Sequence, residues 1–153
     1  MTSLTERLDQ DAKDAMRAKD KVRLGSIRRA RAAITEAEKR PDVVAAGGLD
    51  EEARIAVVTK IAKQHRESID QFRAAGRDDL VAKEEEELAV IESYLPAQLG
   101  DEEIEAVVRQ VIESVGASEP RDVGKVMRPA MERLRGQADG GRVKAVAQRL
   151  LEG

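Results

Sequence analysis

Apolar side chains recur about every three or four residues along most of the chain, and this spacing predicts amphipathic helices rather than strands. A first stripe runs from Leu4 to Met16, and a second begins at Leu24, after Asp20. Aspartate favours the start of a helix, because its side chain accepts hydrogen bonds from the first free amides. The pattern leaves open whether residues 1–40 form one helix or two.

A longer pair of helices follows. Pro41 ends the preceding helix, because the residue before proline leaves the α conformation, and the Ala- and Gly-rich residues 42–48 are expected to form a flexible loop. Asp50 is expected to start the next helix, Gly76 to end it, and Asp78 to cap the helix after that. These two helices are predicted to pack as an antiparallel hairpin.

Pro96 marks a boundary, and Asp101 begins a new series of helical stripes. We therefore expect an N-terminal helical bundle or hairpin at 1–95, a hinge at 96–100 and a small three-helix domain at 101–153. The chain has one Phe, one Tyr and no Trp. Because sheet-rich folds draw on aromatic side chains, this composition also favours an all-α fold.

Composition excludes several kinds of site. The chain has no Cys, which rules out disulfides, thiolate zinc sites and cysteine nucleophiles, and its single His rules out a histidine cluster. A phosphate-binding loop motif and a Ser–Lys amidase pattern are also missing. We therefore expect no catalytic residue, no metal and no cofactor. With no apolar run of membrane length and a polar N-terminus, we expect a cytoplasmic protein without membrane contact.

Charge is distributed unevenly around a net value of −3. Residues 19–31 carry six Lys or Arg and one acid, a local charge of +5, whereas residues 78–92 carry seven acids and one Lys, or −6. Residues 121–149 carry eight Lys or Arg and three acids, or +5. Complementary faces of one bundle and solvated surface are a sufficient explanation of the first two segments.

The basic C-terminal segment is a candidate nucleic-acid site. Basic side chains grouped on a helical surface neutralise phosphates without reading sequence. Gly124 leaves backbone exposed beside this group, which allows a phosphate or another helix to approach closely. Since aromatic stacking platforms are lacking, recognition would be of shape and backbone. The candidate residues are Gly124, Lys125, Arg128, Arg135, Arg142 and Lys144.

His65 lies on the apolar stripe of the first hairpin helix, which predicts a buried histidine with satisfied hydrogen bonds rather than a ligand. Hairpin geometry places Glu84 about one turn from it, so a structural contact between the two is expected. A role for His65 in RNA or partner contact is the other reading. The acidic run 84–87 is expected to be mainly surface, because neighbouring helix positions point in different directions and make a poor cation cage.

Several motifs resemble a known family. The matching segments are Val-Gly-Lys-Val-Met at 123–127, Gly-x-Ala-Asp-Gly at 136–140, Gln-His-Arg-Glu-Ser-Ile at 64–69, Ala-Gly-Arg-Asp-Asp-Leu at 75–80 and Glu-Leu-Ala-Val-Ile-Glu-Ser-Tyr-Leu-Pro at 87–96. On these residues the chain resembles the GatB/YqeY family, and specifically its stand-alone bacterial YqeY-type members. The resemblance covers nearly the whole chain. Arg128 departs from the pattern, since the family usually has glycine there.

The resemblance implies a relative of the tail domain that GatB carries within the tRNA-dependent amidotransferase, the part implied to touch tRNA. The first hypothesis is an adaptor without chemistry of its own that binds tRNA, an amidotransferase or a tRNA synthetase. The alternative is a helical protein-interaction module, for which Arg66 and Arg77 are candidate partner-binding residues. A third reading is an enzyme component of carbon–nitrogen ligation with glutamine as amide donor, the activity that the family name carries.

Overall fold

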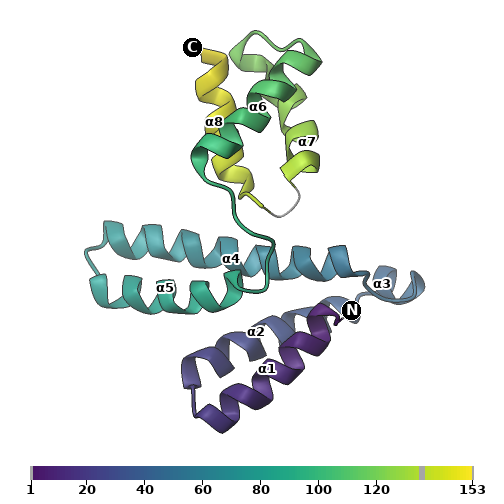
Figure 1. Ribbon diagram of the computed structural model, residues 1–153, viewed down its shortest axis with the longest axis vertical. Helices are drawn as coiled ribbons and strands as arrows, with labels where there is room; N and C mark the ends of the chain where they lie inside the picture. The colour runs from purple at the N-terminus through teal and green to yellow at the C-terminus, as the bar shows by residue number, and fades with distance from the viewer. Residues whose placement is uncertain (1, 135–136, 153) are drawn as a thin grey trace. The chain divides into compact units, whose positions relative to one another are not determined.

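The computed structural model describes residues 2–134 and 137–152, and every regular element in these residues is a helix (Figure 1). This confirms the predicted all-α fold. The chain divides into two compact units, the N-terminal unit Met1–Leu95 and the C-terminal unit Pro96–Gly153. In chain order the elements are α1 (Leu4–Ala18), α2 (Lys21–Glu38), α3 (Pro41–Ala45), α4 (Glu51–Ala74), α5 (Asp78–Glu92), α6 (Asp101–Val115), the 3₁₀ helix η1 (Pro120–Asp122), α7 (Val123–Leu134) and α8 (Gly140–Glu152).

The first 38 residues form two helices, which settles a question that the sequence leaves open. Ser3 caps α1 by accepting a hydrogen bond from the amide of Glu6 at 3.2 Å. Lys19 then adopts a left-handed conformation with φ of 56° and ends the helix. Asp20 caps α2 by accepting from the amide of Arg23 at 3.1 Å. The chain therefore reverses between two capped ends, and α1 and α2 pack against each other.

Two expectations for this region are wrong. Residues 42–48 do not form only a loop, because Pro41 occupies the first position of the short helix α3 and Val43 is buried. Proline fits this position well, since it lacks an amide that the helix could not bond and its φ is already helical. Met16 is half exposed at 51% rather than part of the core. Its sulfur lies 3.6 Å from Nη2 of Arg28, at the rim of the α1–α2 pair.

Helices α4 and α5 form the predicted antiparallel hairpin, and Figure 1 shows them side by side. Asp50 caps α4 by accepting from the amide of Ala53 at 2.8 Å, as expected. Gly76 takes a left-handed conformation with φ of 69° in the turn. The expected cap of α5 is one residue out of place, because Arg77 is the flanking residue and Asp78 is already helical.

The core of the N-terminal unit draws on all its long helices. Fully burying a Leu or Ile side chain stabilises a fold by about 1.5–3 kcal/mol, so these positions contribute most of the stability. Tyr94, just after α5, is also buried; its hydroxyl donates a hydrogen bond to Asp11 of α1, and its ring contacts the guanidinium of Arg7. The largest fully buried apolar side chains of this unit are those of Leu8, Ile27, Ile34, Val58 and Ile91.

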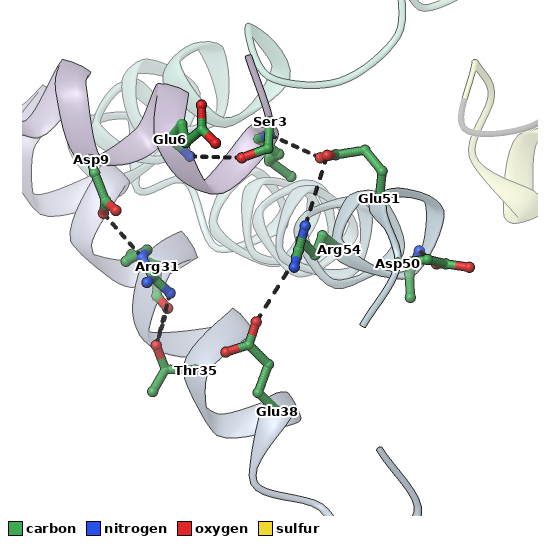
Figure 2. Close-up of polar contacts among 11 residues, drawn as sticks. Ser3, Glu6, Asp9, Arg31, Thr35, Glu38, Asp50, Glu51 and Arg54 are labelled. Atoms are coloured by element: carbon green, nitrogen blue, oxygen red, sulfur yellow. Dashed lines mark hydrogen bonds and ion pairs between the residues drawn. The ribbon is translucent and has the colours of Figure 1, made fainter. Parts of the chain in front are cut away.

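Glu51 joins the starts of two helices that are far apart in sequence. Its carboxylate accepts a hydrogen bond at 2.9 Å from the amide of Leu4, the first residue of α1. The same side chain lies 3.9 Å from Nη1 of Arg54, whose Nε lies 3.9 Å from Glu38 of α2. Figure 2 shows this row of contacts running from α1 through α4 to α2.

The C-terminal unit is built from α6, α7 and α8, which contact one another pairwise. Gly116 ends α6 in a left-handed conformation with φ of 70°, which glycine adopts without steric cost. Asp139 accepts a hydrogen bond from the amide of Gly141 at 3.1 Å and so begins α8. Pro129 lies inside α7. The core consists of the aliphatic side chains of Ile104, Val108, Val111, Val126, Ala130, Leu134, Ala138, Val143, Val146, Ala147 and Leu151.

Hydropathy along these helices does not favour a membrane span. Within the described residues, no helix combines the length and the apolar character that crossing a bilayer requires.

Candidate functional site

The buried stripe of α7 determines which of its side chains face solvent. Val126 and Ala130 are fully buried, so the opposite side of the helix is exposed. Gly124, Lys125 and Arg128 lie on that exposed side. The side chain of Lys125 is 68% exposed and that of Arg128 is 90% exposed. The structure therefore brings three of the sequence-predicted candidates together on one basic surface, defined here as the α7 surface.

The fold does not require glycine at position 124. Its φ is not positive, and a Cβ added there would meet no atom within 4 Å. Glycine in a helix destabilises it by roughly 0.5–1 kcal/mol relative to alanine. The fold alone therefore does not account for glycine at this position, whereas close approach of a ligand to the backbone would.

Nearby carboxylates partly balance the charge of the α7 surface. Nζ of Lys125 lies 3.5 Å from Asp122, and Nε of Arg128 lies 3.7 Å from Glu132. The Arg128–Glu132 pair is exposed and contributes about 0–1 kcal/mol, because water screens it and holding two long side chains costs entropy. Asp122 is more enclosed, since its carboxylate also accepts hydrogen bonds from the amides of Ser118 and Glu119. A phosphate could displace Glu132 from Arg128 at little cost, and it could contact the exposed Lys125 ammonium beside Asp122.

The remaining candidates lie on α8 or outside the described residues. Arg142 donates a hydrogen bond to Asp101 of α6, and this bond holds the pKa of Asp101 below its usual value. Lys144 is exposed and has no ion pair among the described residues. Arg135 lies outside the described residues. The structure thus places Arg142 and Lys144 on a different helix from the α7 surface.

Arg66 and Arg77, the candidate partner-binding residues, make separate contacts. Nη2 of Arg66 lies 3.3 Å from Glu92, which ties α4 to the end of α5. Arg77 donates two hydrogen bonds of 3.2 Å to Asp79 at the start of α5, and the pKa of Asp79 is lowered chiefly by this contact. Both arginines therefore have a structural partner.

His65 is buried between two charged side chains. Its Nδ1 lies 2.6 Å from Oε2 of Glu84, which confirms the predicted contact, and its Nε2 lies 3.2 Å from Nη1 of Arg29. Because arginine only donates, Nε2 must accept, so Nδ1 carries the proton and donates to Glu84. Glu87 also lies within 4.0 Å of Nδ1. The side chains of His65, Glu84 and Glu87 lie close enough together to suggest a metal site. However, Nδ1 of His65 already donates its proton to Glu84, so it has no lone pair for a metal ion.

Arg29 is the residue of this cluster that sequence reasoning missed. It lies 36 positions from His65, on α2, so no local pattern connects them. Two features of the sequence could have indicated a role for Arg29: it belongs to the basic segment 19–31, and it lies on the helix that packs against α4.

A family model matches nearly all of the chain. The model described as Yqey-like protein aligns with residues 5–151. This interval contains both units and almost every residue discussed above.

Three of the curated relatives share the name Altered inheritance of mitochondria protein 41, mitochondrial. The protein of Pyrenophora tritici-repentis is 34% identical over 135 residues, which is 86% of this chain and 71% of that protein. The protein of Eremothecium gossypii is 39% identical over 100 residues, or 63% of this chain and 51% of that protein. The Saccharomyces cerevisiae protein is 36% identical over 95 residues and is matched over 49% of its length. The matched region thus spans about half the length of the last two relatives.

These relatives contradict the expectation of a bacterial, cytoplasmic protein, because they are fungal proteins named as mitochondrial. The expectation of a cytoplasmic location rested on the lack of an apolar signal segment. Mitochondrial transit peptides are amphipathic and Arg-rich, so the lack of an apolar run does not distinguish these compartments.

Proposed function

Because the chain belongs to the YqeY family, we propose that it is an adaptor without chemistry of its own that binds tRNA, alone or beside a tRNA-dependent amidotransferase. The observation that carries this proposal is the α7 surface, where Lys125 and Arg128 lie within one turn of an exposed glycine. Positive side chains beside accessible backbone suit a phosphate–sugar strand. The resemblance to the amidotransferase tail domain supports the choice of tRNA.

The chemistry of the α7 surface limits what it recognises. Lys and Arg contacts to phosphates fix the position of a nucleic acid and carry no sequence information directly. The C-terminal unit contains no aromatic residue on which a base could stack. We therefore expect binding to many tRNAs with similar affinity and with a strong dependence on salt.

Charge reversal provides the test. Lys125→Glu with Arg128→Glu removes two phosphate contacts, so the slope of log affinity against log salt is expected to become less steep by about 1.4–1.8 units. The measurement is filter binding of total tRNA over a range of salt concentrations, with mitochondrial tRNAs included because the named relatives are mitochondrial. Lys60→Glu with Lys63→Glu, two exposed positions on α4, is the matched control.

A second variant separates binding from stability. Gly124→Ala is expected to raise the free energy of unfolding by roughly 0.5–1 kcal/mol, because alanine favours the helix, and to weaken tRNA binding, because the methyl group blocks approach to the backbone. If the α7 variants bind tRNA as the wild type does, or if the wild type binds none at moderate salt, the adaptor proposal fails. A protein-interaction module would then be the better description.

A further inference from the structure

A groove of about 370 Å³ lies between α2 and α5 in the N-terminal unit. It shares no residue with the α7 surface. This groove, defined here as the Gly25 groove, is lined by Lys21, Val22, Gly25, Ser26 and Arg29 of α2 and by Lys83 and Glu87 of α5. Its volume falls within the range of about 300–1,000 Å³ that is usual for small-molecule sites.

Three cations of the groove lack a carboxylate partner among the described residues. They are Lys21, Arg29 and Lys83. Two other arginines of α2 are paired with carboxylates of α1: Arg23 lies 3.8 Å from Asp11, and Arg31 lies 3.0 Å from Asp9. Arg28 instead contacts the sulfur of Met16. The cations that α2 contributes to the groove are therefore not neutralised by a carboxylate of the described residues.

The charge of the groove is positive even though one acid lines it. Glu87 is that acid, and its carboxylate lies 4.0 Å from Nδ1 of His65. Lys21, Gly25 and Arg29 are spaced four residues apart, which places them on one side of α2. With Lys83 opposite, the lining carries three cations against one anion.

Arg29 is held in place by side chains that do not neutralise its positive charge. Its Nη1 contacts Nε2 of His65 at 3.2 Å, and its Nη2 donates to Oε1 of Gln64 at 3.1 Å. Both partners are neutral acceptors. The guanidinium is therefore oriented before any ligand arrives, and its positive charge remains available.

Ser26 and Gly25 both lie on the part of α2 that borders the groove. Ser26 is one of two buried polar side chains, 5% exposed, and its hydroxyl has no hydrogen-bond partner among the described residues. Ser26 borders the groove, so its hydroxyl is available to donate a hydrogen bond to a ligand there. Gly25 lies inside α2 without a positive φ, and a Cβ there would meet no atom within 4 Å.

We propose that the Gly25 groove binds the phosphate group of a nucleotide. Arg29, Lys21 and Lys83 neutralise the phosphate, the Ser26 hydroxyl donates a hydrogen bond to it, and Gly25 leaves room for its approach to α2. Val22 and the side-chain stems supply an apolar wall for the rest of the ligand. A free nucleotide and a nucleotide within an RNA strand carry the same phosphate oxygens, so the experiment tests both sources.

The experiment measures binding of ADP and of a short single-stranded RNA to the full chain by calorimetry. Gly25→Leu places a side chain in the groove at a position where an added Cβ meets no atom within 4 Å, and leucine favours the helix. Lys83→Glu reverses an exposed charge. Each is expected to weaken binding about tenfold or more, since charge-assisted phosphate contacts are strong. Ser26→Ala is expected to cost about threefold to tenfold. Lys60→Glu, the same charge change on exposed α4, is the control and is expected to leave affinity within about twofold.

Each outcome decides the proposal. Weaker ADP binding in the groove variants identifies a free nucleotide as ligand, and weaker RNA binding alone identifies a strand. Failure of the wild type to bind either probe, or equal effects of Lys83→Glu and Lys60→Glu, overturns the proposal. Lys125→Glu with Arg128→Glu reports separately on the adaptor proposal, because those residues are not part of the groove.

Discussion

The two units bury their helices in different ways. The C-terminal unit has a core of Val, Ile, Leu and Ala, with no buried polar side chain among the described residues. The N-terminal unit buries Ser26 and His65 and ties His65 to Arg29 and Glu84. Apolar contacts tolerate small shifts of one helix along another, whereas hydrogen bonds do not. We infer that the polar cluster fixes the positions of α2, α4 and α5 more narrowly than apolar packing fixes α6, α7 and α8.

The largest expected effect comes from opening a cavity in either core. Ile104→Ala in the C-terminal unit and Ile91→Ala in the N-terminal unit each remove a fully buried side chain and should cost about 2–5 kcal/mol. Because the two cores are separate, amide hydrogen exchange should accelerate only in the unit that carries the change. Equal acceleration in both units would show that they unfold together.

The His65 cluster is expected to have the next largest effect. His65→Leu removes the acceptor of Arg29 and the donor to Glu84, so it should lower the free energy of unfolding by about 1–3 kcal/mol. Urea unfolding followed by circular dichroism measures the change. Glu86→Gln, an exposed position on α5, is the control and should stay within about 0.5 kcal/mol. A leucine variant as stable as the wild type would remove the argument that this cluster fixes the helices.

Tyr94 gives the N-terminal unit a distinct response to alkaline pH. Burial, and then the hydrogen bond to Asp11, raise the pKa of Tyr94 to about 12 from 10.0. The raised pKa means that the associated stability is complete below about pH 10 and is lost as pH rises through about 12. Since Tyr94 is the only tyrosine, the absorbance of tyrosinate reports it directly. Ionisation near pH 10 in the native protein would contradict the buried hydrogen bond, and Asp11→Asn should lower the midpoint.

The smallest effect is expected at acidic pH, in the C-terminal unit. Hydrogen bonds from Arg142 lower the pKa of Asp101, and hydrogen bonds from Arg109 and Arg149 lower that of Glu105. A lowered pKa contributes stability above the ordinary values of 3.8 and 4.5, which is lost as pH falls through the native pKa values. Arg142→Gln with Arg149→Gln should flatten the dependence of Tm on pH below about 4.5. An unchanged acid profile would mean that these exposed pairs contribute nothing.

Sequence periodicity predicted the helices and their hairpin well, because a helix that buries one side needs apolar residues every three or four positions. It failed where local chemistry decided the outcome. The helix before Pro41 ends at Glu38 as predicted, but residues 42–48 are not all loop, because proline also suits the first position of a helix and Pro41 begins α3. Met16 followed the apolar spacing, but α1 is covered on one side only and leaves it half exposed.

In the candidate sites, too, some contacts follow from helix spacing and others depend on how the helices pack. The contact between His65 and Glu84 followed from hairpin geometry, since both residues belong to adjoining helices. Arg29 and the Gly25 groove could not be predicted, because they depend on how α2 lies against α4 and α5. The apolar stripe predicts the exposed side of α7, whereas the contacts of Lys125 and Arg128 with nearby carboxylates depend on side-chain conformations that spacing does not determine. The predicted hinge at 96–100 and the roles of all candidate residues remain predictions.

The bond between the Leu4 amide and the Glu51 carboxylate has a consequence for synthesis of the chain. The two residues are 47 positions apart, so α1 emerges from the ribosome well before the group that completes its first turn. At about 5–20 residues per second, that delay is roughly 2–10 s. During this time the amide of Leu4 can bond only to water or to a transient partner. The N-terminal helix is therefore exposed to chaperones and proteases until α4 has been made.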